Sequence, residues 1–216
     1  MNAPPAAGLP SWCPRLISTF EECDARAKHV AADLTSAQLN WQPQPGAWSI
    51  GQCIDHLANA NDVYLPAIER SLAHRSPDRA VDEIVPGLFG RWFIRNYIEP
   101  SENTRRAKAP KKIVPASAVT PEVLDRLLRG NERARQLVRR AAAYDVNRVR
   151  FTNPFIPIIR FTVGTGLEVL SRHERRHLLQ AERVRETLAR ACGVRRAAST
   201  TPTGNTRGGG TRGAAD

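Results

Sequence analysis

The sequence lacks a run of about 18 apolar residues, the length that a membrane-spanning helix requires. The start of the chain also lacks the basic residues and the apolar stretch that mark a secretory signal. Cysteine is scarce, with four residues and no C-x-x-C pair, so neither a disulfide framework nor a soft-metal site is expected. These absences predict a cytoplasmic protein whose thiols are reduced and structural.

Acidic residues are fewer than basic ones, since the sequence contains 21 Asp and Glu but 32 Lys and Arg, which gives a formal net charge of +11. Such an excess favours a polyanionic partner when it is concentrated on one surface. Part of it falls in a connection at residues 105–112 and in the segment from residue 194, and aromatic residues are not interleaved with it. We therefore predict solvated charge, and nucleic-acid binding is a less favoured function.

Apolar residues recur at the three- and four-residue spacing of amphipathic helices in four segments. The second segment begins with Ser49-Ile50-Gly51-Gln52, a capping box, and the third follows Thr120-Pro121-Glu122, a typical helix start. The fourth ends at Gly193, where glycine is suited to a C-terminal cap. The expected helices cover about residues 14–35, 50–72, 121–141 and 164–192.

We expect one domain over residues 14–193 and a disordered, basic, low-complexity tail over residues 194–216. Between residues 76 and 119 lies a long proline-rich connection with a short amphipathic helix around residues 88–97. This helix is expected to cover the core, and a lid over a pocket is the less favoured alternative. Residues 149–163 alternate prolines with bulky apolar side chains. Because prolines disfavour a central strand, this last segment is predicted to be a buried connection.

Two histidines, His173 and His177, lie four residues apart on the inward seam of the fourth helix, between leucines. At this spacing they are one helical turn apart, about 6 Å along the axis, so both imidazoles can reach one metal ion. A metal ion would also satisfy the ring nitrogens in an otherwise apolar seam. Arg172 and Arg176 are predicted on the opposite, solvent-facing side of this helix.

The stretch His173-Glu174-Arg175-Arg176-His177 also matches the H-E-x-x-H pattern of zinc proteases, in which the glutamate is the general base. In the longer form of that pattern a glycine and a third histidine follow, but Gln180 and Arg183 occupy those positions. No convincing sheet is predicted that would bind an extended peptide. A protease is therefore a less favoured alternative, and Glu174 is a candidate base or hydrogen-bond partner of a metal ligand.

A third histidine, His56, falls at the margin of the apolar face of the second helix, where it is expected to point toward a neighbouring helix. Its surroundings, Trp48 to Leu57, resemble the W-S-x-x-x-x-x-x-H-L start of the second helix in the DinB/YfiT-like superfamily. Residues 173–180 resemble that superfamily's H-x-x-x-H helix with its trailing glutamine. The resemblance covers about residues 14–190.

The resemblance implies an all-α four-helix bundle of up-down-down-up topology with long crossing connections, and a metal triad of His56, His173 and His177. Three imidazoles suit a divalent transition metal such as Zn, Ni, Fe, Mn or Cu. An open fourth position would let this metal activate water or a thiol. Because the superfamily includes thiol-dependent transferases and isomerases, the resemblance implies a small-molecule substrate and a low-molecular-weight thiol as partners. Members of the superfamily often form dimers, so a homodimer is also expected.

Two classes of function stay open at this point. A metal-dependent transferase or hydrolase requires a free coordination position beside a cavity. In a non-catalytic metal-binding or structural bundle, a fourth protein donor would instead occupy the remaining coordination position of the metal. Nothing in the residues selects a substrate.

Overall fold

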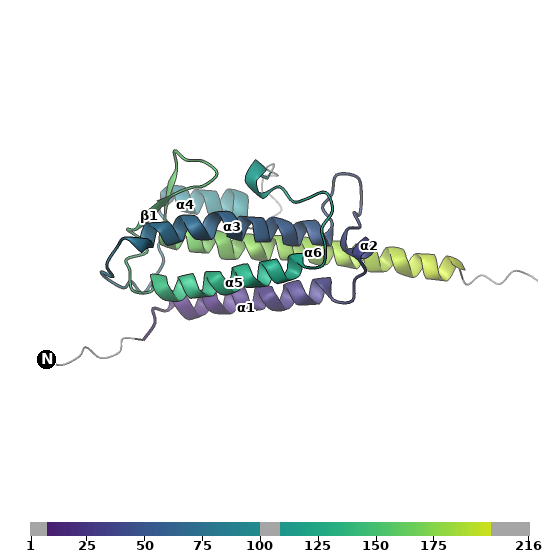
Figure 1. Ribbon diagram of the computed structural model, residues 1–216, viewed down its shortest axis with the longest axis horizontal. Helices are drawn as coiled ribbons and strands as arrows, with labels where there is room; N and C mark the ends of the chain where they lie inside the picture. Colours follow the sequence, from purple (N-terminus) through teal and green to yellow (C-terminus); the bar gives the residue numbers. More distant parts are fainter. Residues whose placement is uncertain (1–7, 100–108, 200–216) are drawn as a thin grey trace, which may run out of the picture.

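Four long helices form the body of the protein in a computed structural model that describes residues 8–99 and 109–199 (Figure 1). Helices α1 and α6 run in one direction, while α3 and α5 run in the other, which is the expected up-down-down-up topology (Figure 1). Helices α1 and α3 each pack against both α5 and α6. The bundle helices are α1 (Trp12–Ala31), α3 (Ile50–Ala73), α5 (Val123–Ala141) and α6 (Val163–Ser199).

Helix α3 begins where the capping box predicts, because the Ser49 side chain accepts from the Gln52 amide and the Gln52 side chain accepts from the Ser49 amide. A second capping box, formed by Thr35 and Gln38, starts the short helix α2 (Ser36–Leu39). Helix α2 was not predicted, because no element was expected between the helices at residues 14–35 and 50–72. The same T-x-x-Q pattern was available to predict it.

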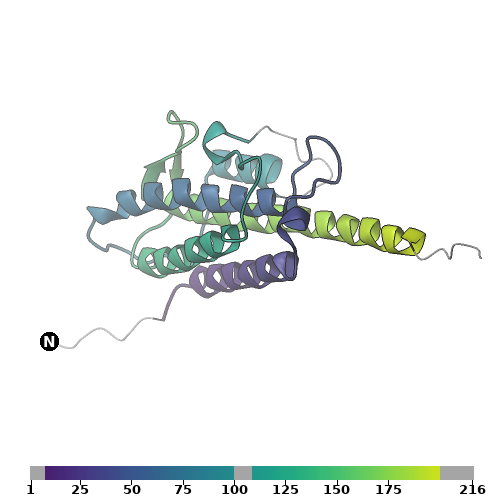
Figure 2. The same cartoon turned by 45° about the vertical axis from the view of Figure 1, so that its right-hand side comes forward.

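Helix α6 continues to Ser199, so the C-terminal cap predicted at Gly193 is wrong (Figures 1 and 2). Arginine and alanine, both strong helix formers, follow this glycine, and an added Cβ at Gly193 would meet nothing within 4 Å. The end of α6 extends beyond the other bundle helices in both views. Disorder was predicted for residues 194–216, but residues 194–199 continue helix α6, and residues 200–216 lie outside the described residues. The domain boundary at residue 193 stays a prediction.

The proline-rich segment at residues 149–163 forms a two-stranded antiparallel hairpin, β1 (Arg150–Thr152) and β2 (Arg160–Thr162). The buried rings of Phe151 and Phe161 are paired across it and face the bundle core. Gly166 permits this close packing, because an added Cβ would lie 2.6 Å from the Phe151 ring. The prediction of a buried connection is therefore only partly right, because the strands bury their phenylalanines while the tip of the hairpin is exposed, with Ile158 at 91%. Prolines permit such short strands outside a central strand.

The described residues of the long connection between α3 and α5 form three short helical pieces. Two of them follow one another as the expected amphipathic helix, and the second packs along α6, while the third packs along α3. None of the described helices is both long and apolar enough to cross a bilayer. The pieces are α4 (Leu88–Phe93), the π-helical turn η1 (Ile94–Ile98) and the 3-10 turn η2 (Lys111–Ile113).

The apolar core is divided into two clusters of buried side chains, one toward the hairpin end of the bundle and one toward α2. Tyr64 and Leu170 belong to the first cluster, whereas Leu57 and Leu178 belong to the second. On α3 and on α6, the residues between these positions include polar side chains that point inward. A polar layer therefore crosses the middle of the bundle. His173 and His177 of the candidate site lie in it, and His56 lies at its edge, next to Leu57.

Candidate metal centre

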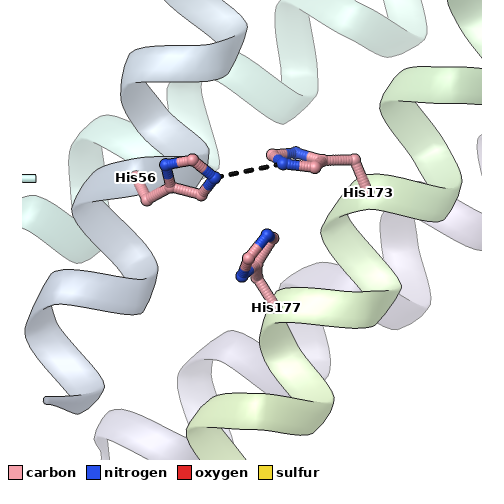
Figure 3. Close-up of side chains that lie close together, drawn as sticks. All are labelled: His56, His173 and His177. Carbon is pink, nitrogen blue, oxygen red and sulfur yellow. Dashed lines mark hydrogen bonds between the residues drawn. The ribbon is translucent and has the colours of Figure 1, made fainter. Parts of the chain in front are cut away.

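His56 enters the polar layer from α3 with only 2% of its surface exposed. Its Nδ1 lies 2.7 Å from the carbonyl oxygen of Ile113 in η2, so Nδ1 carries the ring hydrogen and donates it. The Nε2 lone pair is then directed at α6, where His173 Nε2 lies 3.1 Å away (Figure 3). The crossing connection thus fixes the tautomer and the direction of this imidazole.

His173 and His177 project from successive turns of α6 toward His56 (Figure 3). The Nδ1 of His177 lies 3.0 Å from the side-chain oxygen Oε1 of Gln180, which accepts its hydrogen and leaves Nε2 free to act as a ligand. Both histidines are half-buried, because part of each ring faces a cavity. The glutamine that follows the H-x-x-x-H pair therefore orients one of its members.

The three imidazoles that the family resemblance groups as a triad lie close to one another. One ligand nitrogen from each histidine lies within 4.8 Å of the other two, against the roughly 3 to 4 Å expected around one bound ion. The pair formed by His56 and His173, at 3.1 Å, already has the expected spacing. Three neutral imidazoles with converging lone pairs are a donor set suited to a transition metal.

Burial keeps these histidines neutral, which is the form that binds a metal. Loss of hydration lowers the pKa of His56 below its ordinary value, and it lowers that of His173 much further. Burial, reinforced by the nearby His56, lowers the pKa of His177 to about 3. Protons therefore compete poorly for the three ring nitrogens at neutral pH.

A cavity of about 620 Å³ opens beside the three histidines. Trp48 covers them on one side, with ring centroids 4.7 Å from His56 and 5.6 Å from His177. Segments distant in the sequence, namely α3, α4, η1, the hairpin and α6, supply the remaining walls. The aromatic side chains of the 88–97 segment contribute to this lining, whereas Tyr64, Asn153 and Arg176 were not expected in it.

Arg176 corrects one prediction, because it lines the cavity instead of projecting into solvent. It is half-buried, and its Nη1 donates to the carbonyl oxygen of Tyr97 at 2.6 Å. Helical periodicity placed Arg176 on the side away from the apolar seam of α6. The turn η1 packs along α6, and this long-range contact turns a flank of the helix into a cavity wall.

Glu174 is fully buried and is not among the residues that line the cavity. Its Oε1 accepts from Asn61 at 3.2 Å, and its Oε2 accepts from Asn131 at 3.0 Å. Burial raises the pKa of this carboxyl to about 8. Glu174 thus occupies a separate polar cluster inside the bundle, and the geometry gives no support to its predicted role as a base.

Comparisons with known proteins agree with this fold. The sequence profile of the DinB superfamily matches residues 19–181. The solved structure of YfiT from Bacillus subtilis, described as "a probable metal-dependent hydrolase with an unusual four-helix bundle topology", is similar with a TM-score of 0.54 and 18% sequence identity. This match covers 89% of the present chain and 94% of YfiT. The search of curated proteins found no match.

Proposed function

Because the chain belongs to the DinB superfamily, we propose that it is a metal-dependent enzyme that holds a divalent transition metal through His56, His173 and His177. The observation that carries the proposal is the convergence of three neutral imidazoles beside a cavity. The description of YfiT as a probable metal-dependent hydrolase is consistent with it. Zn, Ni, Fe and Mn are the candidate metals.

The protein residues prepare the site before any ligand arrives. Ile113 and Gln180 accept the ring hydrogens of His56 and His177, so both rings present Nε2 to the same place. Trp48 and the apolar walls exclude bulk water from one side of the triad. A metal ion bound there would supply a Lewis acid that lowers the pKa of a bound water or thiol.

The cavity favours a thiol-dependent transferase over a hydrolase. Among its described lining residues there is no Asp or Glu that would take a proton from water. A thiol ionises near pH 8.5 in water, so it needs less assistance to become a nucleophile. We therefore infer attack by a low-molecular-weight thiolate on an electrophilic small molecule, with the thiol sulfur forming the new bond and the displaced group leaving as an anion.

A non-catalytic metal-binding bundle is the second candidate. It would require a fourth protein donor that completes the coordination of the metal. Among the described residues, only three histidines cluster at the site. The open cavity beside them favours catalysis. Full coordination of the bound metal by protein ligands would reverse this choice.

The experiment that tests the proposal is elemental analysis of purified protein, stripped with a chelator and reloaded with Zn, Ni, Fe or Mn in turn. We expect about one metal ion per chain in the wild type and in His74→Ala, whose imidazole is exposed at the end of α3. His177→Ala should retain almost none. Equal metal content in all three proteins would refute the site.

Catalysis is tested on the same preparations. The loaded wild type should accelerate conjugation of small thiols to a chromogenic aryl halide, and His177→Ala should not. A loaded protein that binds one metal and shows no turnover with thiols or with activated esters would favour the non-catalytic candidate.

A further inference from the structure

The cavity beside the histidines is largely apolar and aromatic. Rings from four different elements face it, and the hairpin adds aliphatic side chains. Its volume of about 620 Å³ falls in the range of sites for small organic ligands. The aromatic lining consists of Trp48, Tyr64, Phe89, Trp92, Phe93 and Phe155, together with Tyr97.

One guanidinium interrupts these apolar walls. Arg176 is the only Lys, Arg, Asp or Glu among the described residues that line the cavity. It lies next to His177 in the sequence and lines the same cavity as His56 and His173, so it is close to the metal centre. Any ligand that fills the cavity will therefore meet a positive charge beside the metal.

Arg176 has no acidic partner among the described residues, in contrast to its neighbour one turn earlier. Arg172 forms ion pairs with both Glu168 and Glu99. Arg176 donates one hydrogen bond, from Nη1 to the Tyr97 carbonyl, and no acceptor for Nε or Nη2 is found in the described part of the chain. A half-buried guanidinium without a counter-ion is costly, and an anion would relieve that cost.

The two remaining donors suggest which anion fits. Nε–H and Nη2–H lie parallel on one edge of a guanidinium and match the two oxygens of a carboxylate. The apolar walls require that the rest of the ligand be apolar as well, because they offer few hydrogen-bond partners. A doubly charged phosphate ester would face only one described cation in the cavity.

We propose that the cavity binds an amphipathic carboxylate, whose aromatic or branched apolar body packs against the aromatic walls and whose carboxylate pairs with Arg176. This ligand is the electrophilic substrate of the proposed enzyme, so the inference rests on the proposed function. The guanidinium holds the substrate beside the three histidines, and the metal stays free for the thiol.

The test is isothermal titration calorimetry, which measures the affinity for naphthalene-2-carboxylate and for its neutral isostere naphthalene-2-carboxamide. Both the metal-free and the zinc-loaded protein are titrated. The wild type should bind the carboxylate about tenfold or more tightly than the amide. Arg176→Gln should lose that preference and keep its affinity for the amide. Arg175→Gln removes an exposed arginine from the adjacent position and should behave as the wild type.

Three outcomes would overturn the proposal. They are equal affinity of the wild type for both probes, a carboxylate preference that survives in Arg176→Gln, and no binding of either probe. A preference that appears only with zinc and persists in Arg176→Gln would assign the anion to the metal instead. Circular dichroism checks that each variant is folded. Arg176→Lys keeps the positive charge but lacks the two parallel N–H donors of the guanidinium, so it should show an intermediate preference for the carboxylate.

The metal-free arm separates this inference from the proposed function. Should the protein fail to take up zinc, the metal-free titrations still decide whether Arg176 selects carboxylates. If the protein takes up zinc but shows no preference for the carboxylate, the metal centre is supported and the proposed substrate class is refuted.

Discussion

His173 and Glu174 are neighbours in the sequence but belong to two different polar regions of the same bundle. His173 faces the cavity with His56 and His177, and its imidazole is half-buried. Glu174, turned about 100° around the helix axis, is fully buried between the bundle helices. Both regions lie in the polar layer between the two apolar clusters. They differ in whether their polar atoms already have partners.

The Glu174 region is closed. Asn131 donates both to Glu174 and to Asp24, and Arg135 forms an ion pair with Asp24 at 2.6 Å. The exception in this region is Oδ1 of Asn61, the residue whose amide nitrogen donates to Glu174, and it is the one buried side-chain nitrogen or oxygen in the described residues that lacks a partner. The histidine region is open, because its ligand nitrogens face each other and a cavity. We infer that the closed region contributes to stability and the open region to ligand binding.

Replacing His173 should produce the largest contrast between the regions. His173→Ala removes one of three ligands, so zinc affinity should fall at least about a hundredfold, measured by competition with a chromophoric chelator. Glu174→Gln, one residue away, should retain the affinity of the wild type. Equal losses in the two variants would show that the regions are not separate.

The pH dependence of stability should distinguish the closed region. The Glu174 pKa is raised to about 8, so the folded state holds a proton that the unfolded state releases near pH 4.5. Stability is therefore present at low pH and falls as the pH rises from about 5 to 8, by on the order of 4 kcal/mol at most. Denaturant unfolding of metal-free protein should show this fall, and Glu174→Gln should lack it. The same slope in both proteins would contradict a buried, protonated Glu174.

Truncating Asn131 should destabilise the fold without affecting the metal centre. Asn131→Ala leaves a buried oxygen of Glu174 and a partly buried oxygen of Asp24 without this donor, at a cost of about 2 kcal/mol in the free energy of unfolding. Gln136→Ala, an exposed change on the same helix, should cost less than about 0.5 kcal/mol. Zinc stoichiometry should stay unchanged in both. Loss of zinc from Asn131→Ala would mean that the closed region supports the open one.

A smaller effect is expected at Gln180. Gln180→Ala removes the acceptor that orients His177, and zinc affinity should fall by about tenfold in the chelator competition. Gln180→Glu keeps an acceptor oxygen at this place and should retain the affinity. Equal affinity in the alanine variant and the wild type would show that His177 needs no orientation.

Much of the open region could be predicted from the sequence because its determinants are local. The spacing of His173 and His177 fixes their common face on a helix, and the capping box at Ser49 sets where α3 begins. The helical period then directs His56 inward. The resemblance to a known family supplied the pairing of α3 with α6, which periodicity alone does not specify.

The closed region and the cavity walls depend on contacts between distant segments. Glu174 matched a protease pattern, and nothing local revealed that Asn61 and Asn131 would enclose it. Arg176 was placed in solvent because the position of η1 across α6 is not encoded in the period of α6. Sequence periodicity assigns a side chain to a face of its own helix, and tertiary packing decides what covers that face.

The central claim is that three imidazoles, and not Glu174, bind the metal. X-ray absorption spectroscopy of the zinc-loaded protein tests it most directly, because multiple scattering from imidazole rings counts the histidine ligands. We predict three imidazoles together with at least one ligand that does not come from the protein, and an unchanged spectrum in Glu174→Gln. Two or fewer imidazoles, or a spectrum that loses an oxygen ligand in Glu174→Gln, would contradict the claim.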